Sequence, residues 1–199
     1  MSYTEGKTPV LETEETRELL DSIDTSHVVG LRDRAVIGVM LFTFARIGAV
    51  IQLQVKDYAP QGKKFFLKLA EKGSKERKIP VHHTLEEYLD AYIEAGGLSE
   101  SPHTPLFRST RGRSRTLTER ALSRDSAWRM IRRRVADAGL AGEICNHSFR
   151  ATGITNFLTN GGSRDRAQYI AGHADVRTTA LYDRRREMVS LDDIERIRF

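Results

Sequence analysis

The chain of 199 residues is 39% hydrophobic and 30% charged, the composition of a globular protein with enough apolar side chains for one domain core. It has no apolar run of membrane-spanning length and no signal-peptide pattern at its N-terminus, so we expect no membrane partner and a cytoplasmic location. The single cysteine, Cys145, excludes a disulfide within the chain and fits a reducing compartment.

The charge is divided unevenly along the chain. Residues 1–100 carry 13 lysines and arginines against 16 carboxylates, whereas residues 101–199 carry 19 against 11. Between residues 108 and 150 all 11 basic residues are arginines, and only 4 residues are acidic. Because arginine binds phosphate through two parallel hydrogen bonds, this pattern favours a polyanionic partner. The charge alone fits a solvated basic face without a ligand equally well.

The first predicted elements are helices. Residues 1–10 have no periodicity, and we expect them to form a flexible lead-in. A helix is predicted at about residues 14–24, with Thr13 as its N-cap. A second helix is predicted from Leu31 to Phe44, and it is apolar nearly all round, which indicates deep burial.

Two strands follow at residues 65–69 and 77–81, on either side of a polar turn at residues 71–75. Pro80 marks the second strand as an edge strand or as the end of one. Residues 96–116, rich in Gly, Ser, Arg and Pro, predict a loop. Further helices are predicted at about residues 84–95, 124–138, 147–160, 163–171, 175–188 and 191–197. The predicted fold class is mainly α with a small antiparallel β-sheet (α+β).

The last third of the chain carries the most informative motif. The segment His147–Arg150 places an imidazole and a guanidinium three residues apart, on one face of a helix. Further on, His173 precedes Tyr182 by nine residues, and Arg46 follows the apolar helix upstream. Guanidiniums, imidazoles and a phenol together suit the binding of a phosphodiester and its attack by tyrosine. The sequence holds no P-loop, no zinc-binding spacing and no carboxylate cluster suited to magnesium, so we expect neither a metal nor a cofactor.

On these residues the chain resembles the catalytic domain of the tyrosine recombinases, the phage-integrase family of site-specific DNA strand-exchange enzymes, over about residues 8–190. The resemblance implies that family's catalytic-domain fold over residues 11–190, double-stranded DNA as substrate and a tetramer on paired sites. It also implies that residues 1–10 end a core-binding domain or linker, and that residues 191–199 dock onto a neighbouring subunit.

The resemblance implies a role for each member of the motif. Arg46 and Arg150 would bind the two non-bridging oxygens of the scissile phosphate. His147 would donate to a phosphate oxygen or accept the proton of the tyrosine, and His173 would hydrogen-bond the phosphate. Tyr182 would be the nucleophile that forms a 3′-phosphotyrosyl intermediate. A hydroxyl of the partner strand would later reverse this step.

The polar turn resembles a hairpin of the family whose lysine protonates the leaving 5′ oxygen. The Lys-Gly-x-Lys pattern assigns this role to Lys72, with Lys75 as the alternative. Further DNA contacts are expected from basic side chains of the hairpin and of the arginine-rich region: Lys75, Arg77, Arg111, Arg113, Arg115, Arg132 and Arg133.

Three other functions fit parts of the sequence. Ala49 stands three residues after Arg46, where the family usually has an acidic residue that helps to orient neighbouring groups. This departure favours a catalytically weak or inactive DNA-binding remnant of a recombinase. A type IB topoisomerase-like DNA-relaxing enzyme would share the tyrosine chemistry. A plain helix-turn-helix regulator would leave the motif as a coincidence.

Overall fold

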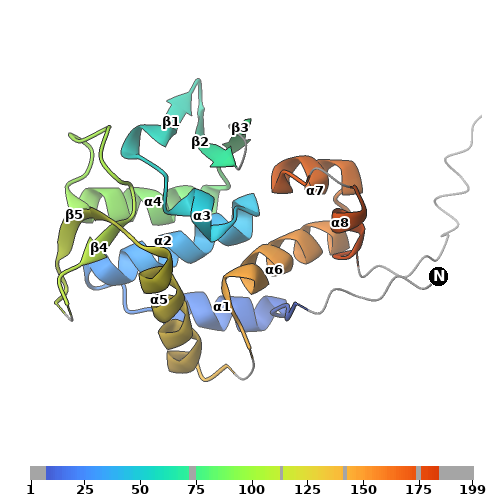
Figure 1. The fold of residues 1–199 in the computed structure, drawn as a ribbon, viewed down its shortest axis with the longest axis horizontal. Coiled ribbons are helices and arrows are strands. Elements are labelled where there is room, and N and C mark those ends of the chain that lie inside the picture. The colour runs from blue at the N-terminus through green and yellow to red at the C-terminus, as the bar shows by residue number, and fades with distance from the viewer. Residues whose placement is uncertain (1–7, 72–74, 113, 141–142, 174–175, 184–199) are drawn as a thin grey trace, which may run out of the picture.

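The structure is a computed structural model that describes residues 8–71, 75–112, 114–140, 143–173 and 176–183. Within these ranges, helices form most of the fold and two small antiparallel sheets lie at its periphery (Figure 1). No helix in these ranges is both long and apolar enough to cross a bilayer. The α+β class predicted from the sequence is confirmed.

The elements are the helices α1 (Thr13–Asp21), α2 (Val28–Thr43), α3 (Ile47–Val50), α4 (His83–Gly96), α5 (Arg124–Asp137), α6 (Asn146–Thr159), α7 (Arg164–Ala171) and α8 (Val176–Ala180), the 3-10 turn Val55–Asp57, and the strands β1 (Tyr58–Gln61), β2 (Lys64–Glu71), β3 (Lys75–Pro80), β4 (Arg108–Thr110) and β5 (Leu117–Ala121).

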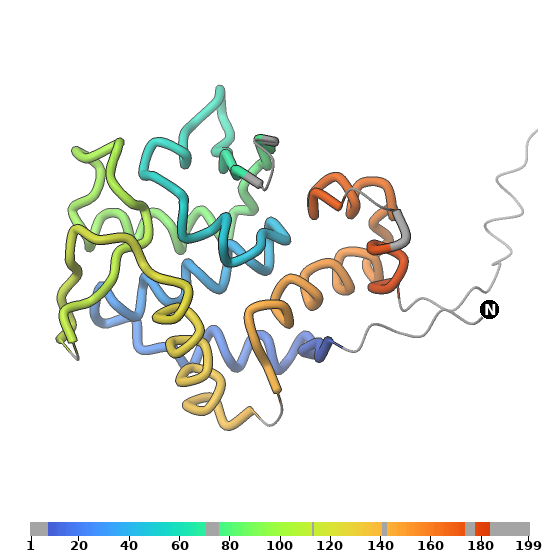
Figure 2. The backbone as a smooth tube through the Cα atoms, viewed as in Figure 1, coloured from blue at the N-terminus to red at the C-terminus, as the bar shows by residue number. Residues whose placement is uncertain are grey.

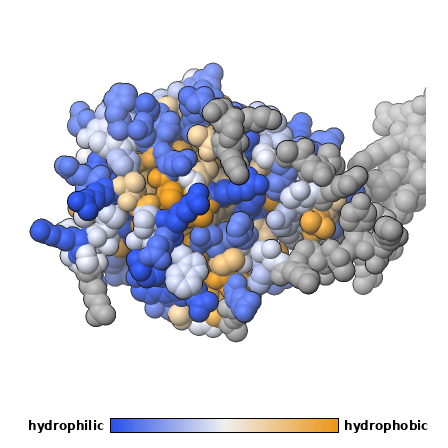
Figure 3. Space-filling model, in the orientation of Figure 1, coloured by the Kyte–Doolittle hydropathy of each residue, from blue (hydrophilic) through white to orange (hydrophobic). Residues whose placement is uncertain are grey.

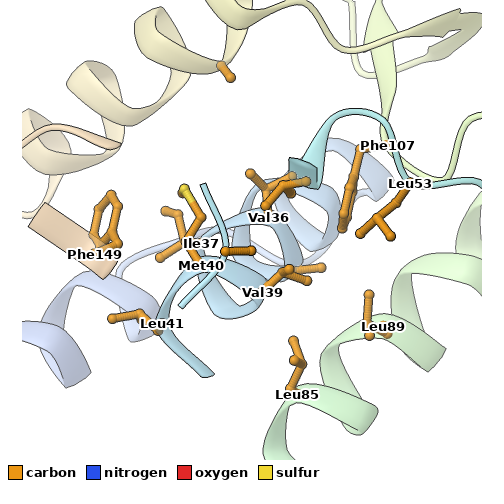
Figure 4. Packing of buried hydrophobic residues seen from close by; sticks show 14 of the residues in the cluster. Val36, Ile37, Val39, Met40, Leu41, Leu53, Leu85, Leu89, Phe107 and Phe149 are labelled. Carbon is orange, nitrogen blue, oxygen red and sulfur yellow. The ribbon is translucent and has the colours of Figure 1, made fainter. Parts of the chain in front are cut away.

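Helix α2 is the centre of the fold. It has no polar face along most of its length, and Val36, Ile37, Val39 and Met40 are completely buried (Figure 4). It packs against α4 and α6 and touches α5. Each large apolar side chain buried in this way stabilises the fold by roughly 1.5–3 kcal/mol. The prediction of a deeply buried helix is therefore confirmed.

Two helices begin at residues other than those predicted, because their caps lie elsewhere. Thr13 is the first residue of α1, so its prediction as the N-cap is wrong. Glu12 is the cap, and its amide donates to the Glu15 carboxylate over 2.8 Å. Helix α2 begins three residues early because the His27 Nδ1 accepts the Gly30 amide over 3.1 Å.

Strands β1, β2 and β3 form the larger sheet, in that order and antiparallel throughout. Leu67 and Leu69 of β2 face the core, and the exposed Lys68 lies between them. Pro80 is the last residue of the edge strand β3, as predicted, so its missing N–H costs no ladder hydrogen bond. Residues 72–74 of the connecting turn lie outside the described residues.

Three of the strands in the described part of the chain are absent from the sequence prediction. In β1 only Tyr58 is buried, and β4 lies within the loop predicted at residues 96–116. With β5, these strands are shorter and more polar than the runs that reveal strands in a sequence. Helix α4 supports β4, because the Tyr92 hydroxyl donates to the Leu106 carbonyl, just before that strand, over 2.9 Å.

Helices α6 and α7 form a second, smaller core, against which Tyr182 packs, and the backbones of α6, α7 and α8 lie close together (Figure 2). Phe44, which follows α2, packs into this smaller core together with Ile154 and Leu158 of α6. Helix α6 lies very close to α2 at Gly153, where a Cβ atom would collide with the Leu41 carbonyl. Glycine at position 153 therefore sets the distance between the two helices.

We expect Gly153→Ala to lower the free energy of unfolding by about 1–3 kcal/mol, because the methyl group meets backbone that cannot move without opening the core. Urea denaturation measures this change. Gly38→Ala is the matched control, since its Cβ would meet only side-chain atoms of Leu85 and Tyr88, at 3.1 and 3.2 Å. Equal losses in the two variants would contradict the importance of the close approach.

Candidate active site

A groove of about 1360 Å³ opens between the β2–β3 hairpin, α3, the N-terminal ends of α5 and α6, and α7. Its lining includes Arg46, His147 and His173, three predicted catalytic residues that lie far apart in the sequence. Arg77 from β3 and Arg124 from α5 add two further guanidiniums. The groove therefore gathers positive charge and imidazoles around one space.

Arg46 reaches the groove because the chain turns sharply after α2. The helix ends at Thr43, and Phe44 adopts a left-handed conformation with φ 54°. Arg46 then caps α3 with extended backbone and an exposed side chain. Two residues therefore separate Arg46 from the buried helix that precedes it, and its side chain lines the groove.

Arg150 is buried, at 3% exposure. Its Nη1 donates to the Phe44 carbonyl, and its Nη2 donates to the Ala171 carbonyl over 2.6 Å. These carbonyls lie at the C-terminal ends of α2 and α7, where helix geometry leaves backbone oxygens without partners and with partial negative charge. Arg150 thus joins the helix end before Arg46 to the helix end before His173.

His173 follows a glycine C-cap, as the sequence predicts. Gly172 has φ 61°, and the His173 amide donates to the Gln168 carbonyl over 3.1 Å, in a Schellman arrangement. The His173 Nδ1 and the Thr179 hydroxyl share a hydrogen bond of 2.9 Å. Thr179 is completely buried, so it fixes the orientation of the imidazole. The contact of Thr179 with His173 is not predicted from the sequence, although the Thr178-Thr179 pair shortly before Tyr182 is the signal that could have indicated it.

The surroundings of His173 lower its pKa to about 4 from an ordinary value of 6.5. Burial of the ring is the main cause, and the charges of Arg150, Arg46 and Arg77 add to it. The imidazole is therefore neutral at pH 7. It can donate or accept a hydrogen bond there, but it adds no positive charge.

Tyr182 lies beside this imidazole. The two rings stack with 5.9 Å between their centroids and 13° between their planes. The Thr155 hydroxyl donates to the Tyr182 carbonyl over 3.3 Å, and the following Asp183 carboxylate accepts from the Arg164 Nε over 2.5 Å. The chain is thus held at Tyr182 and at the residue that follows it.

The helix predicted over residues 175–188 differs from the structure. Helix α8 ends at Ala180, and Tyr182 lies in the turn that follows, where its amide donates to the Thr179 carbonyl over 3.1 Å. The prediction of a helical Tyr182 is wrong, because a short helix followed by a turn brings the ring to His173. Residues 184–199, with the predicted helix at 191–197, lie outside the described residues.

His147 is exposed in the first turn of α6, one turn before the buried Arg150. Lys72 lies outside the described residues, and Lys75 is described in β3 only by its backbone. The hairpin itself borders the groove through Ala70 and Glu76. The assignment of the hairpin lysine therefore stays a prediction.

The remaining predicted DNA contacts lie in several environments. Arg111 and Arg115 are exposed beside β4 and β5, and Arg113 is outside the described residues. Arg132 lies 5.7 Å from the ring centre of the half-exposed Trp128, and Arg133 lies 3.5 Å from the Asp33 carboxylate. Hydrophilic side chains cover much of the face seen in Figure 3, with small apolar areas between them. The predicted contacts thus extend well beyond the groove.

Arg124 and Arg77 differ from their sequence interpretations. Arg124 is not predicted as a site residue, yet its guanidinium lies against α3, where a Cβ on Gly48 would be 2.7 Å from the Arg124 Nη2. The arginine-rich composition is the one signal that points to it. Arg77, predicted only as a DNA contact, is 8% exposed and lies in the groove against Gly172.

Comparison with known proteins identifies the relatives. The sequence matches the model of the phage integrase family over residues 9–188. It is 32% identical over 177 residues to the tyrosine recombinase XerD of Staphylococcus saprophyticus, covering 87% of this chain and 57% of that protein. It is 29% identical over 177 residues to XerD of Listeria innocua, with the same coverage of 87% and 57%. The chain thus spans less than two thirds of the length of these curated relatives.

Solved structures agree with the sequence comparison. The XerH site-specific recombinase bound to a palindromic difH substrate has a TM-score of 0.73 and 25% identity, over 89% of this chain and 50% of that chain. A lambda integrase dimer bound to a COC′ core site has a TM-score of 0.68 and 19% identity, over 95% of this chain and 64% of that chain. At this identity the similarity shows a shared fold only. The fold is that of a tyrosine recombinase catalytic domain. The chain belongs to the phage integrase family.

The lowered pKa of His173 has a consequence for stability. Between pH 6.5 and 4 the unfolded chain binds a proton that the folded chain does not, so stability is complete above pH 6.5 and falls as the pH drops toward 4. We expect the free energy of unfolding to fall more steeply over this window in the wild type than in His173→Gln. Denaturation at several pH values measures this difference, and NMR titration of the imidazole should give a midpoint near 4. A midpoint near 6.5 would contradict the burial of the ring.

Proposed function

We propose that this chain is the catalytic domain of a site-specific DNA recombinase that cleaves and rejoins strands through a tyrosine. The observation that carries the proposal is the stacking of Tyr182 on His173 at 5.9 Å, beside a groove that Arg46 and His147 also line. Membership of the phage integrase family supports it. Residues 11–190 would form the catalytic domain of a longer protein.

The proposed reaction is a transesterification. The Tyr182 hydroxyl loses its proton and attacks the phosphorus, the bond to the 5′ oxygen breaks, and a 3′-phosphotyrosyl linkage forms. His147 accepts the proton of the phenol or donates to a phosphate oxygen. The leaving 5′ oxygen takes a proton from Lys72, with Lys75 as the alternative donor. A 5′ hydroxyl of the partner strand later reverses these steps.

The cations stabilise the charge that accumulates on the phosphate in the transition state. Arg46 is exposed in the groove, and Arg150 acts from the buried position between two helix ends. A fixed donor of this kind is worth roughly 2.7–4 kcal/mol of transition-state stabilisation. His173 serves as a neutral hydrogen-bonding group, because its pKa of about 4 keeps it unprotonated at pH 7.

The substrate is double-stranded DNA, and the protein would act as a tetramer on paired sites. We propose a cytoplasmic location for this bacterial or phage-type protein, on the nucleoid when it is bound to DNA. Residues 1–10 would connect to a core-binding domain, and residues 191–199 would dock onto a neighbouring subunit. The basic C-terminal half, with 19 lysines and arginines against 11 carboxylates, supports a polyanionic partner.

A covalent adduct tests the proposal. The protein is incubated with labelled DNA suicide substrates, nicked or with a 5′-bridging phosphorothioate, taken from DNA that flanks the gene. We expect an adduct on denaturing gels with the wild type and none with Tyr182→Phe. Tyr88→Phe is the matched control, because Tyr88 lies on α4 outside the groove and should keep full adduct formation.

Two results would favour another function. DNA retardation without any adduct, in a protein that carries its core-binding domain, would favour the inactive remnant. Ala49, which lines the groove without a carboxylate, is the residue that supports this alternative. Relaxation of supercoiled plasmid without a preferred site would favour a topoisomerase-like enzyme.

The salt dependence of DNA binding tests the contacts outside the groove. We expect Arg111→Gln and Arg132→Gln each to reduce the slope of log Kobs against log salt by about 0.9, the value for one phosphate contact. Arg17→Gln is the control, because Arg17 is an exposed residue of α1 whose Nη1 already lies 3.0 Å from the Glu14 carboxylate. An unchanged slope in the first two variants would remove these residues from the interface.

A further inference from the structure

We infer that Arg77 is a positioning residue of this site, which holds the turn that carries His173 against strand β3. This inference rests on the proposed function and adds a residue to its machinery. Arg77 lies on the inner face of β3 with Ile79, whereas the neighbouring Glu76 and Lys78 are exposed. A charged side chain on the inner face, 8% exposed, needs polar partners there.

The last turn of α7 provides such a partner. The Arg77 Nη1 donates to the Tyr169 carbonyl over 3.3 Å. This carbonyl belongs to the C-terminal turn of the helix, whose partial negative charge attracts a cation. On another side of the same helix end, Arg150 donates to the Ala171 carbonyl over 2.6 Å. Two guanidiniums from different elements, β3 and α6, therefore hold the end of α7.

The Arg77 guanidinium also occupies the space in front of Gly172. A Cβ atom on Gly172 would lie 2.7 Å from the Arg77 Nε and 2.9 Å from its Cζ. The glycine is thus required for two separate reasons: its φ of 61° disfavours any side chain, and Arg77 fills the place where one would stand. The Gly-His pair and Arg77 form one packed unit.

This unit links the hairpin to the imidazole. His173 follows Gly172 directly, and its ring bonds to Thr179 and stacks on Tyr182. A shift of the α7 end would move the imidazole relative to the phenol. Since a misplacement of about 1 Å can cost 100-fold in rate, the contact of Arg77 with the end of α7 affects catalysis through the position of His173.

A double-mutant cycle tests the contact without relying on catalysis. The cycle combines Arg77→Gln and Gly172→Ala in the whole chain and measures the unfolding equilibrium constant by denaturation. The strain of alanine at positive φ is the same in both backgrounds and cancels. We expect Gly172→Ala to raise this constant at least about threefold more when Arg77 is present than when it is Gln. Additive effects would overturn the inference.

The rate of DNA cleavage distinguishes a positioning role of Arg77 from direct contact of its guanidinium with the phosphate. The suicide substrate is prepared with a normal phosphate and with a neutral methylphosphonate at the scissile position. We expect Arg77→Gln to slow adduct formation about tenfold or more on both substrates, because a positioning residue does not act on the phosphate charge. Restoration of the rate by the methylphosphonate would show that Arg77 binds the phosphate itself, and positioning would be wrong.

Two further variants complete the design. Lys78→Gln is the matched control, a neighbouring cation on the outer face of β3, and should leave the rate and the His173 imidazole NMR signals unchanged. Arg77→Lys keeps the charge but not the planar fork, and we expect it to shift the His173 signals and slow cleavage even if Arg77→Gln fails to fold. Unshifted signals in a folded Arg77→Lys protein would overturn the inference. If the wild type forms no adduct, the proposed function fails, and the cycle and the NMR signals still decide the role of Arg77.

Discussion

The buried guanidinium of Arg150 is the interaction on which the site depends. It donates to carbonyls at the C-terminal ends of α2 and α7, two helices separated by most of the chain. A buried cation is costly unless its hydrogen bonds are satisfied, and unpartnered helix-end carbonyls are costly as well. The guanidinium and the carbonyls provide the hydrogen-bond partners that each would otherwise lack, so the two helix ends are held beside one another. The groove forms between the segments that leave those ends.

Three residues of the proposed site consequently come directly after helices. Arg46 comes after α2, His173 after α7 and Tyr182 after α8. A side chain just beyond a helix is free of the packing that orders the helix interior, yet the cap still fixes its backbone. Arg46 and His173 therefore reach the groove from separate elements, and Tyr182 stacks on His173, while the apolar core around α2 keeps the surrounding elements in place.

The sequence predicts local features of this fold well and long-range ones poorly. Helices α5 and α7 lie within one residue of their predicted bounds, because Ser123 and Ser163 cap them and apolar residues follow at helical spacing. The exposure of Arg46 and the burial of Arg150 and Arg77 escape prediction. Each depends on a segment distant in sequence, as in the contact of Arg150 with Phe44, 106 residues away. The motif identifies the site residues, but their division into groove-lining and buried groups requires the fold.

Phe44 limits what evolution or mutagenesis can do at this junction. Its φ of 54° is rare for a residue with a side chain, and such a conformation costs roughly 1–2 kcal/mol. Glycine would relax the backbone but would remove the ring, which packs edge-on against Phe157 with 5.9 Å between centroids. A large aliphatic side chain would keep the strain without reproducing this edge-on ring contact. Position 44 therefore has little mutational tolerance, and a randomised library of this protein should retain phenylalanine there.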